Sequence, residues 1–215
     1  TIAGTSCLVE NRQENWSIEV ARRFGIPEKL YTEIVEPRTF KGNLRQEIQI
    51  QTGMKNTRLV ATVGHDSAAA VAAIPDFGEN KLYISIGTNV SMGVERSECL
   101  LSREGYLKGF KNTGGIDRKK IIYRDFSACW HLNEFIRTRK EQGITYSFVD
   151  LINMALEVKN PVPWFDVEVL SFNEAGGDFC RKMNQYFAQT GQRELTEDGE
   201  FVRSIYESIV LKIRH

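Results

Sequence analysis

The sequence predicts an α/β fold, and three stretches carry that prediction. Leu59 to Val63 is a short apolar run rich in β-branched residues, as expected of a buried strand. A run of small residues, Ser67 to Ala73, follows it and favours a helix that Pro75 ends. Near the C-terminus, apolar residues recur at helical spacing, most clearly at Phe201, Ile205 and Ile209.

The first fifty residues predict two short helices. Asn15-Trp16-Ser17 opens an amphipathic helix in which Trp16, Val20 and Phe24 form one stripe, and Gly25 ends it. We interpret Trp16 as a core residue. The polar run from Arg45 to Thr52 predicts a surface helix that leads into a turn at Gly53.

Gly64 ends the predicted buried strand, and His65 and Asp66 follow it directly. The carboxyl ends of strands are where open α/β sheets bind ligands. Asp66 is therefore open to two interpretations, a helix N-cap or a general base or metal ligand. His65 alone fits a buried structural histidine as well as a catalyst.

Lys81 to Glu95 predicts a β-hairpin. Leu82, Ile84 and Ile86 alternate with other residues, which predicts a strand with one buried face. Gly87-Thr88-Asn89 interrupts the pattern as a turn. Such a turn can aim backbone N–H groups and a hydroxyl at a phosphate, although most turns of this composition are only turns.

The last ninety residues predict helices. One runs from Arg124 to Gln142, with Gly143 after it, and we interpret His131 within it as structural. Ser147 and Asp150 form a capping-box pattern, and Gly176-Gly177-Asp178 opens a further helix that ends at Gln189. Thr196 is the predicted cap of the last helix.

Composition limits the classes of function. The 215 residues carry a formal net charge of zero and a pI of about 6.8, so charge favours neither nucleic acid nor a membrane surface as a partner. The sequence shows no signal peptide and no transmembrane run. Its four cysteines are far apart and predict reduced thiols in a cytoplasmic protein, with neither zinc nor disulfides.

Two motifs together resemble one protein family. The chain reads GHDSAAAVAAIP and, after a short connection, YISIGTNVSMGVE. These motifs and their separation resemble the FGGY carbohydrate kinases of the actin-like ATPase superfamily, and most of all the rhamnulokinase type. The last segment, TGQRELTEDGEFVRSIYESIVLKIRH, resembles the same family almost throughout.

The resemblance implies an actin-like ATPase fold made of ribonuclease H-like domains, present here in part. Residues 1–76 would be the end of the N-terminal, sugar-binding domain, and residues 77–215 a truncated C-terminal, nucleotide-binding domain. The family's first phosphate loop, DxGTxS, and its adenosine motif, GGGxxN, do not occur in the sequence. We therefore expect an internal fragment that is inactive alone, with exposed apolar edges that favour self-association.

The reaction implied by the resemblance is transfer of the ATP γ-phosphoryl group to a hydroxyl of a ketose such as L-rhamnulose, with Mg²⁺ as cofactor. Asp66 would be the catalytic base and would also bind the sugar with His65 and Ser67. Asp125 stands where the family has a substrate-contacting Asn, which puts the identity of the sugar in doubt. The resemblance implies no metal ligand from the protein in this segment.

The nucleotide site implied by the resemblance consists of Gly87, Thr88 and Asn133. Asn133 stands where the family has a nucleotide-contacting Gln, so the amide is kept on a shorter side chain. Two alternatives remain open: a fuculokinase-type or xylulokinase-type kinase, and a non-catalytic actin-like module that binds sugar or nucleotide.

Overall fold

The computed structural model of the chain describes residues 2–75 and 80–215. These residues form two compact units, the first made of Thr1–Tyr83 and Gly93–Arg124 and the second of Ile84–Met92 and Asp125–His215. Each unit is therefore discontinuous in sequence. The predicted boundary between the family's domains, at residues 76 and 77, remains a prediction, and residue 76 lies outside the described residues.

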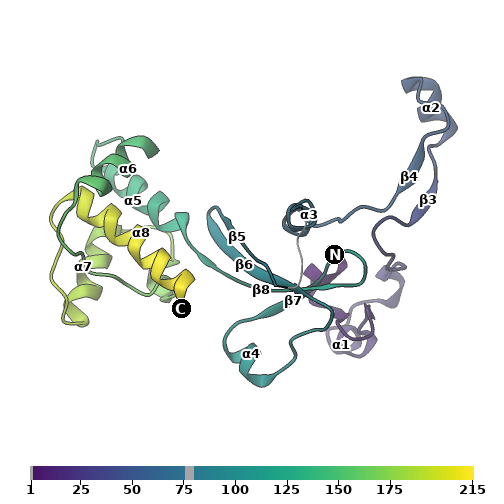
Figure 1. Cartoon of the computed structure of the whole chain (residues 1–215), viewed down its shortest axis with the longest axis horizontal. Coiled ribbons are helices and arrows are strands. Elements are labelled where there is room, and N and C mark those ends of the chain that lie inside the picture. The colour runs from purple at the N-terminus through teal and green to yellow at the C-terminus, as the bar shows by residue number, and fades with distance from the viewer. Residues whose placement is uncertain (1, 76–79) are drawn as a thin grey trace. The chain divides into compact units, whose positions relative to one another are not determined.

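The first unit begins with short elements (Figure 1). In chain order they are η1 Ile2–Ser6, β1 Val9–Glu10, β2 Asn15–Trp16, α1 Ile18–Arg23, η2 Glu28–Leu30, β3 Phe40–Asn43, α2 Gln46–Thr52, β4 Arg58–Val60 and α3 Asp66–Ala72. The predicted surface helix before Gly53 is confirmed as α2, and Gly53 has the positive φ of 73° that allows a glycine to end a helix. The predictions for Trp16 are wrong, because it lies in β2 before α1 and is only half-buried rather than a core residue of the helix. It donates its indole N–H to the Thr32 carbonyl oxygen at 2.6 Å.

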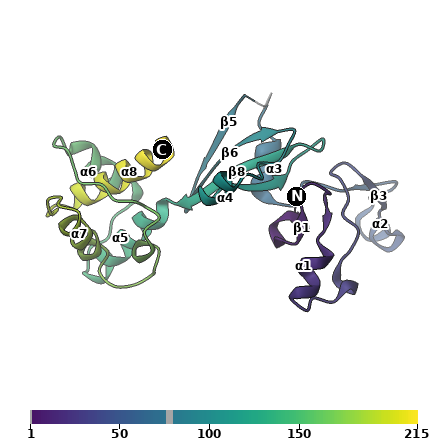
Figure 2. The same cartoon turned by 90° about the horizontal axis from the view of Figure 1, so that it is seen from below.

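A four-stranded sheet has the strand order β5-β6-β8-β7 (Figure 2). Its strands are β5 Leu82–Ile86, β6 Asn89–Arg96, β7 Lys111–Gly114 and β8 Lys120–Ser127, with α4 Arg103–Leu107 between β6 and β7. β7 pairs antiparallel with β8, and Asn112 lies opposite Ile122. In the first unit, α3 packs Ala68 and Val71 against Ile121 of β8.

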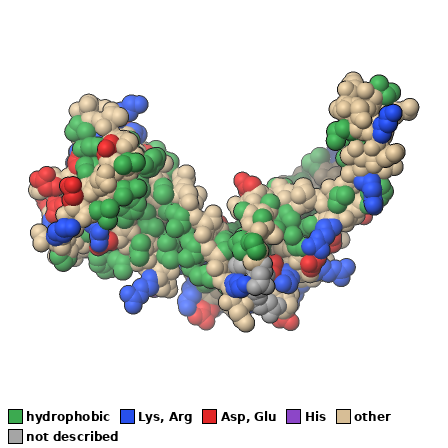
Figure 3. Space-filling model, turned by 45° about the horizontal axis from the view of Figure 1, so that its top comes forward, with side chains coloured by type: hydrophobic (Ala, Val, Ile, Leu, Met, Phe, Trp, Pro, Cys, Tyr) green, Lys and Arg blue, Asp and Glu red, His purple; other side chains and the backbone are tan. Residues whose placement is uncertain are grey.

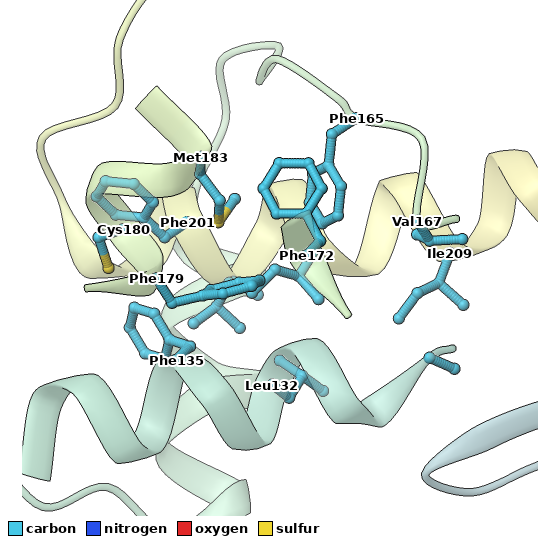
Figure 4. Close-up of a cluster of buried hydrophobic side chains, with 14 of the residues drawn as sticks. Leu132, Phe135, Phe165, Val167, Phe172, Phe179, Cys180, Met183, Phe201 and Ile209 are labelled. Atoms are coloured by element: carbon cyan, nitrogen blue, oxygen red, sulfur yellow. The ribbon is translucent and has the colours of Figure 1, made fainter. Parts of the chain in front are cut away.

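The second unit is mainly helical. Its helices are α5 Cys129–Glu141, α6 Phe148–Glu157, η3 Leu170–Phe172, α7 Phe179–Gln189 and α8 Asp198–Arg214. Their apolar stripes meet in one core, where Phe172 lies between Phe165 and Phe179 at ring-centroid distances of 4.5 and 5.9 Å (Figure 4). The helical spacing of Phe201, Ile205 and Ile209 predicts this packing correctly, since all three are buried.

His131 of α5 is fully buried in this core. Its ring stacks on Phe179 at 6.0 Å and meets Phe165 edge-on at 5.5 Å. Burial among these rings lowers the pKa of His131 from 6.5 to about 4, an effect that the backbone of Val167 and Phe172 offsets only in part. The side chain is therefore neutral at pH 7, which agrees with a structural role.

In the second unit, two helix starts follow the predicted capping chemistry and one does not. Ser147 and Asp150 form the predicted capping box of α6, and Asp178 caps α7 by accepting a hydrogen bond from the Arg181 N–H. The prediction of Thr196 as the cap of α8 is wrong. Glu197 holds that position and forms a capping box with Glu200, because a Glu side chain is long enough to reach the N3 amide.

Three further predictions of burial or extent are wrong. The predicted buried strand from Leu59 to Val63 is the short strand β4, in which Leu59 and Val60 are 42% and 53% exposed, since β4 pairs only with β3 in the described part of the chain. The predicted buried face of β5 is also exposed. The long helix begins at Cys129 rather than at Arg124, because residues 120–127 continue the sheet as β8.

Candidate functional site

The GHD motif opens α3. His65 occupies the N-cap position without a side-chain capping bond, so the interpretation of Asp66 as the N-cap is wrong and Asp66 is the first helical residue. Asp66 Oδ1 accepts a hydrogen bond from the Ser67 N–H at 2.7 Å, and the Ser67 hydroxyl lies 3.4 Å from the same oxygen. The motif therefore brings His65, Asp66 and Ser67 together at one helix start.

The Asp66 carboxylate is directed to solvent, with its side chain 94% exposed. Its Oδ1 lies 3.5 Å from His65 Nε2. Oδ2 has no hydrogen-bond partner among the described residues, so this oxygen can accept a proton from a bound hydroxyl. His65 Nδ1 is buried and also lacks a partner among the described residues, which leaves a polar atom able to orient a ligand.

The Gly87-Thr88 turn is bound to the start of α5. Within the hairpin, the Gly87 N–H donates to the Asn89 carbonyl oxygen at 2.9 Å. The Gly87 carbonyl accepts from the Cys129 N–H at 3.2 Å, and the Thr88 carbonyl accepts from the Ala128 and Trp130 N–H groups at 3.0 and 3.1 Å. The turn thus satisfies amides that a helix start otherwise leaves without partners.

This bracing fixes the direction of the next amide. A trans peptide unit points its C=O and its N–H to opposite sides. Because the Gly87 carbonyl faces α5, the Thr88 N–H of the same peptide points away from α5. The exposed Thr88 hydroxyl belongs to the same residue, so one amide and one hydroxyl are available to an anion at this turn.

Gly87 is not required by the packing of the chain. A Cβ atom built at this position would meet nothing closer than the Asn89 carbonyl oxygen at 3.8 Å, and its φ is not positive. Gly93 of β6 differs, because a Cβ there would lie 2.5 Å from the Ile122 carbonyl oxygen. The open space at Gly87 fits the close approach of a ligand to the backbone.

Asn133 and Asp125 flank the same helix start. Asn133 is exposed on α5, one turn after Cys129, which places it about 6 Å further along the axis. Asp125 lies on β8 and not on a helix, which corrects its predicted context. Since Phe126 is buried in the core of the second unit, the alternation of a strand directs Asp125 to the opposite face.

The predicted residues therefore form two groups. His65, Asp66 and Ser67 belong to the first unit, whereas the Gly87-Thr88 turn, Asp125 and Asn133 belong to the second. A cleft shared by the two groups remains a prediction. No pattern of side chains indicates the bracing by Ala128, Cys129 and Trp130, because these residues act through backbone amides.

The described residues contain no group of three or more His, Cys, Asp or Glu side chains that could hold a metal ion. Mg²⁺ in phosphoryl-transfer sites needs only one or two carboxylates in addition to the substrate phosphates. The exposed Asp66 fits such a limited role.

No helix within residues 2–75 and 80–215 has the length and apolar character needed to cross a membrane.

Comparison with known proteins gives relatives that match this chain along all or nearly all of its length. No family model matches the chain. The chain is 30% identical over 220 residues to a rhamnulokinase of Bacteroides thetaiotaomicron, a match that covers all of this chain and 43% of the relative. It is 28% identical over 213 residues to a rhamnulokinase of Enterococcus faecalis, of which it covers 42%. The chain thus spans about two fifths of the length of these curated relatives.

Solved structures show the same fold. The chain matches the xylulose kinase of Rhodospirillum rubrum with a TM-score of 0.66 at 13% identity, over 95% of this chain and 40% of the other. It matches the ligand-bound xylulose kinase of Lactobacillus acidophilus with a TM-score of 0.65 at 12% identity, over 96% of this chain and 41% of the other. The predicted fold class, a partial actin-like ATPase fold, is confirmed.

Proposed function

We propose a function from the premise that this chain is related to the FGGY carbohydrate kinases, as its fold and its match to about two fifths of the length of rhamnulokinases indicate. The chain would form part of an enzyme that transfers the γ-phosphoryl group of ATP to a hydroxyl of a ketose. The names of its relatives favour L-rhamnulose as the sugar. We further propose that the 215 residues alone do not turn over, since the DxGTxS motif is not among them.

The single observation that carries the proposal is the environment of Asp66. Phosphoryl transfer needs a group that accepts the proton of the attacking hydroxyl. Asp66 offers Oδ2 for this purpose, while the Ser67 amide holds Oδ1 at 2.7 Å and so limits rotation of the carboxylate. A positioned base of this kind contributes about 10²–10⁴-fold to the rate. His65 and Ser67 would orient the sugar beside it.

The Gly87-Thr88 turn would hold the terminal phosphates of the nucleotide. Its outward amide and hydroxyl supply hydrogen-bond donors, and the open space at Gly87 lets a phosphate approach the backbone. Asn133 would contact the nucleotide one helical turn away, and Asp125 would contact the sugar. Mg²⁺, bound with the nucleotide, would neutralise charge on the transferred group.

The test uses the complete polypeptide that contains these residues, with ATP and Mg²⁺ and with L-rhamnulose, L-fuculose or D-xylulose as acceptor. We expect turnover with L-rhamnulose and a fall in kcat of about 10²–10⁴-fold in Asp66→Asn, with KM for ATP little changed. Glu47→Gln is the matched control, because Glu47 is also an acidic residue in the first turn of a helix.

Near-normal turnover in Asp66→Asn would remove Asp66 as the base. Nucleotide binding without turnover on all three sugars would favour the non-catalytic module. Gly87→Ala is expected to leave the fold unchanged and to raise KM for ATP, because its methyl group would occupy the space proposed for a phosphate.

A further inference from the structure

We propose that Trp130 is a positioning residue for nucleotide binding, an inference that rests on the function proposed for the Gly87-Thr88 turn. Trp130 lies in the first turn of α5 and donates two hydrogen bonds to separate segments of the chain. Its backbone N–H donates to the Thr88 carbonyl oxygen at 3.1 Å. Its indole N–H donates to the Phe172 carbonyl oxygen at 3.2 Å. One residue therefore joins the turn to η3.

Phe172 is held firmly by the core of the second unit. It is fully buried, and its ring lies between those of Phe165 and Phe179 (Figure 4). A side chain packed in this way has little room to move, because protein interiors are close-packed. The indole hydrogen bond to the Phe172 carbonyl oxygen therefore fixes the start of α5 to the core.

The start of α5 depends on the turn for its capping. Its N-cap residue is Ala128, whose side chain carries no hydrogen-bond acceptor. The first amides of the helix donate instead to the carbonyl oxygens of Gly87 and Thr88. The turn and the helix start consequently hold each other, so a contact that anchors one of them also anchors the other.

These contacts determine where the turn presents its donors. Because the Gly87 and Thr88 carbonyls are bound to α5, the Thr88 N–H can shift only if the start of α5 shifts as well or these bonds break. Val90, which is fully buried in the core, holds the β6 side of the hairpin. Trp130 acts on Thr88 itself. Loss of its indole bond would therefore loosen the residue that is proposed to bind a phosphate.

Trp16 provides a matched control for Trp130. Many hydrophobic side chains reach the surface of the molecule (Figure 3), but these two indoles are half-buried and each donates to a backbone carbonyl oxygen of its own unit. The Trp16 bond, to Thr32, lies in the first unit and anchors a different segment. Replacement by Phe removes the same kind of hydrogen bond at both positions.

Isothermal titration calorimetry with ADP and Mg²⁺ on the complete polypeptide tests the proposal. Trp130→Phe keeps an aromatic ring and removes the indole N–H. It is expected to weaken ADP binding about two- to tenfold, because the bond can hold the turn by no more than its own net strength. The affinity for the sugar should stay at the wild-type value, and Trp16→Phe should bind ADP as the wild type does.

A double-mutant cycle separates positioning from a general loss of stability. In Gly87→Ala the phosphate contact at the turn is already impaired. Adding Trp130→Phe to this variant should therefore weaken ADP binding by a smaller factor than in the wild type. Equal factors in both backgrounds would show a merely structural role and would overturn the inference.

Amide hydrogen exchange of the full chain tests the anchor without a nucleotide. Exchange at the Ala128 and Cys129 amides should be faster in Trp130→Phe and unchanged in Trp16→Phe. Unchanged exchange in Trp130→Phe would overturn the inference, as would wild-type ADP affinity in that variant, and both results would leave the kinase proposal standing. A wild-type complete polypeptide that binds no nucleotide would instead overturn the proposed function, and with it the role of Trp130 in nucleotide binding.

Discussion

Acidification from about pH 7.5 to about pH 4.5 is expected to destabilise the second unit by about 2.5 kcal/mol through His131 alone. The unfolded chain binds a proton at this residue below its ordinary pKa of 6.5, whereas burial lowers the pKa in the folded chain to about 4. The unfolded state therefore holds more protons between these values. The stabilisation is complete above pH 6.5 and is lost as the pH falls toward 4.

The magnitude follows from the two pKa values. Each unit of difference is worth 1.36 kcal/mol, so the full span from 6.5 to about 4 corresponds to about 3 kcal/mol, of which about 2.5 kcal/mol is already lost at pH 4.5. This is a large part of the 5–15 kcal/mol that stabilises a typical domain.

Urea unfolding of the full chain, followed by circular dichroism at several pH values, measures this loss. His131→Leu, a buried apolar side chain of similar size, should lack the His131 component while it keeps the pH dependence of the carboxylates. His215→Gln is the matched control, since His215 is exposed, and it should follow the wild-type curve. Equal pH dependence in wild type and His131→Leu would refute the reasoning.

Three further changes test the packing and the capping. Gly93→Ala should destabilise the sheet by about 2 kcal/mol or more, because its Cβ would lie 2.5 Å from the Ile122 carbonyl oxygen, and an unchanged Tm would contradict this. Ser147→Ala should cost about 1 kcal/mol in urea unfolding through loss of the α6 capping box, whereas Ser147→Asp should restore most of it. Asp198→Asn should cost about 3 kcal/mol, because it breaks a largely buried ion pair with Arg139 whose Nε–Oδ1 distance is 2.8 Å, and hydrogen exchange should rise first at the start of α8.

Local chemistry could be predicted from the sequence more completely than burial. The β5–β6 hairpin, the capping box at Ser147 and the start of α7 depend on residues within a few positions of each other, so the sequence specifies them. Leu59 and Ile84 show the limit. Their patterns identify an apolar face correctly, but whether that face is covered depends on elements distant in sequence, and in the described part of the chain both faces are exposed.

In the candidate site, too, local features could be predicted from the sequence and features that depend on distant elements could not. The motif around Asp66 predicts a carboxylate at a helix start, and the structure has one there. The helical spacing of residues 124–142 predicts a helix at Asp125, yet Phe126 fits that spacing and is equally compatible with the end of a strand, which is where it lies in β8. The bracing of the Gly87-Thr88 turn involves main-chain atoms, which every residue carries, and so left no trace in the pattern of side chains.

That bracing limits how the hairpin between β5 and β6 can vary. The two residues of its turn, Gly87 and Thr88, connect the strands and also accept hydrogen bonds from the amides at the start of α5. An inserted residue would move the carbonyls of Gly87 and Thr88 out of reach and let the first turn of the helix unwind, with Asn133 displaced as a result. Length changes should therefore be tolerated between β6 and β7 far better than at this tip.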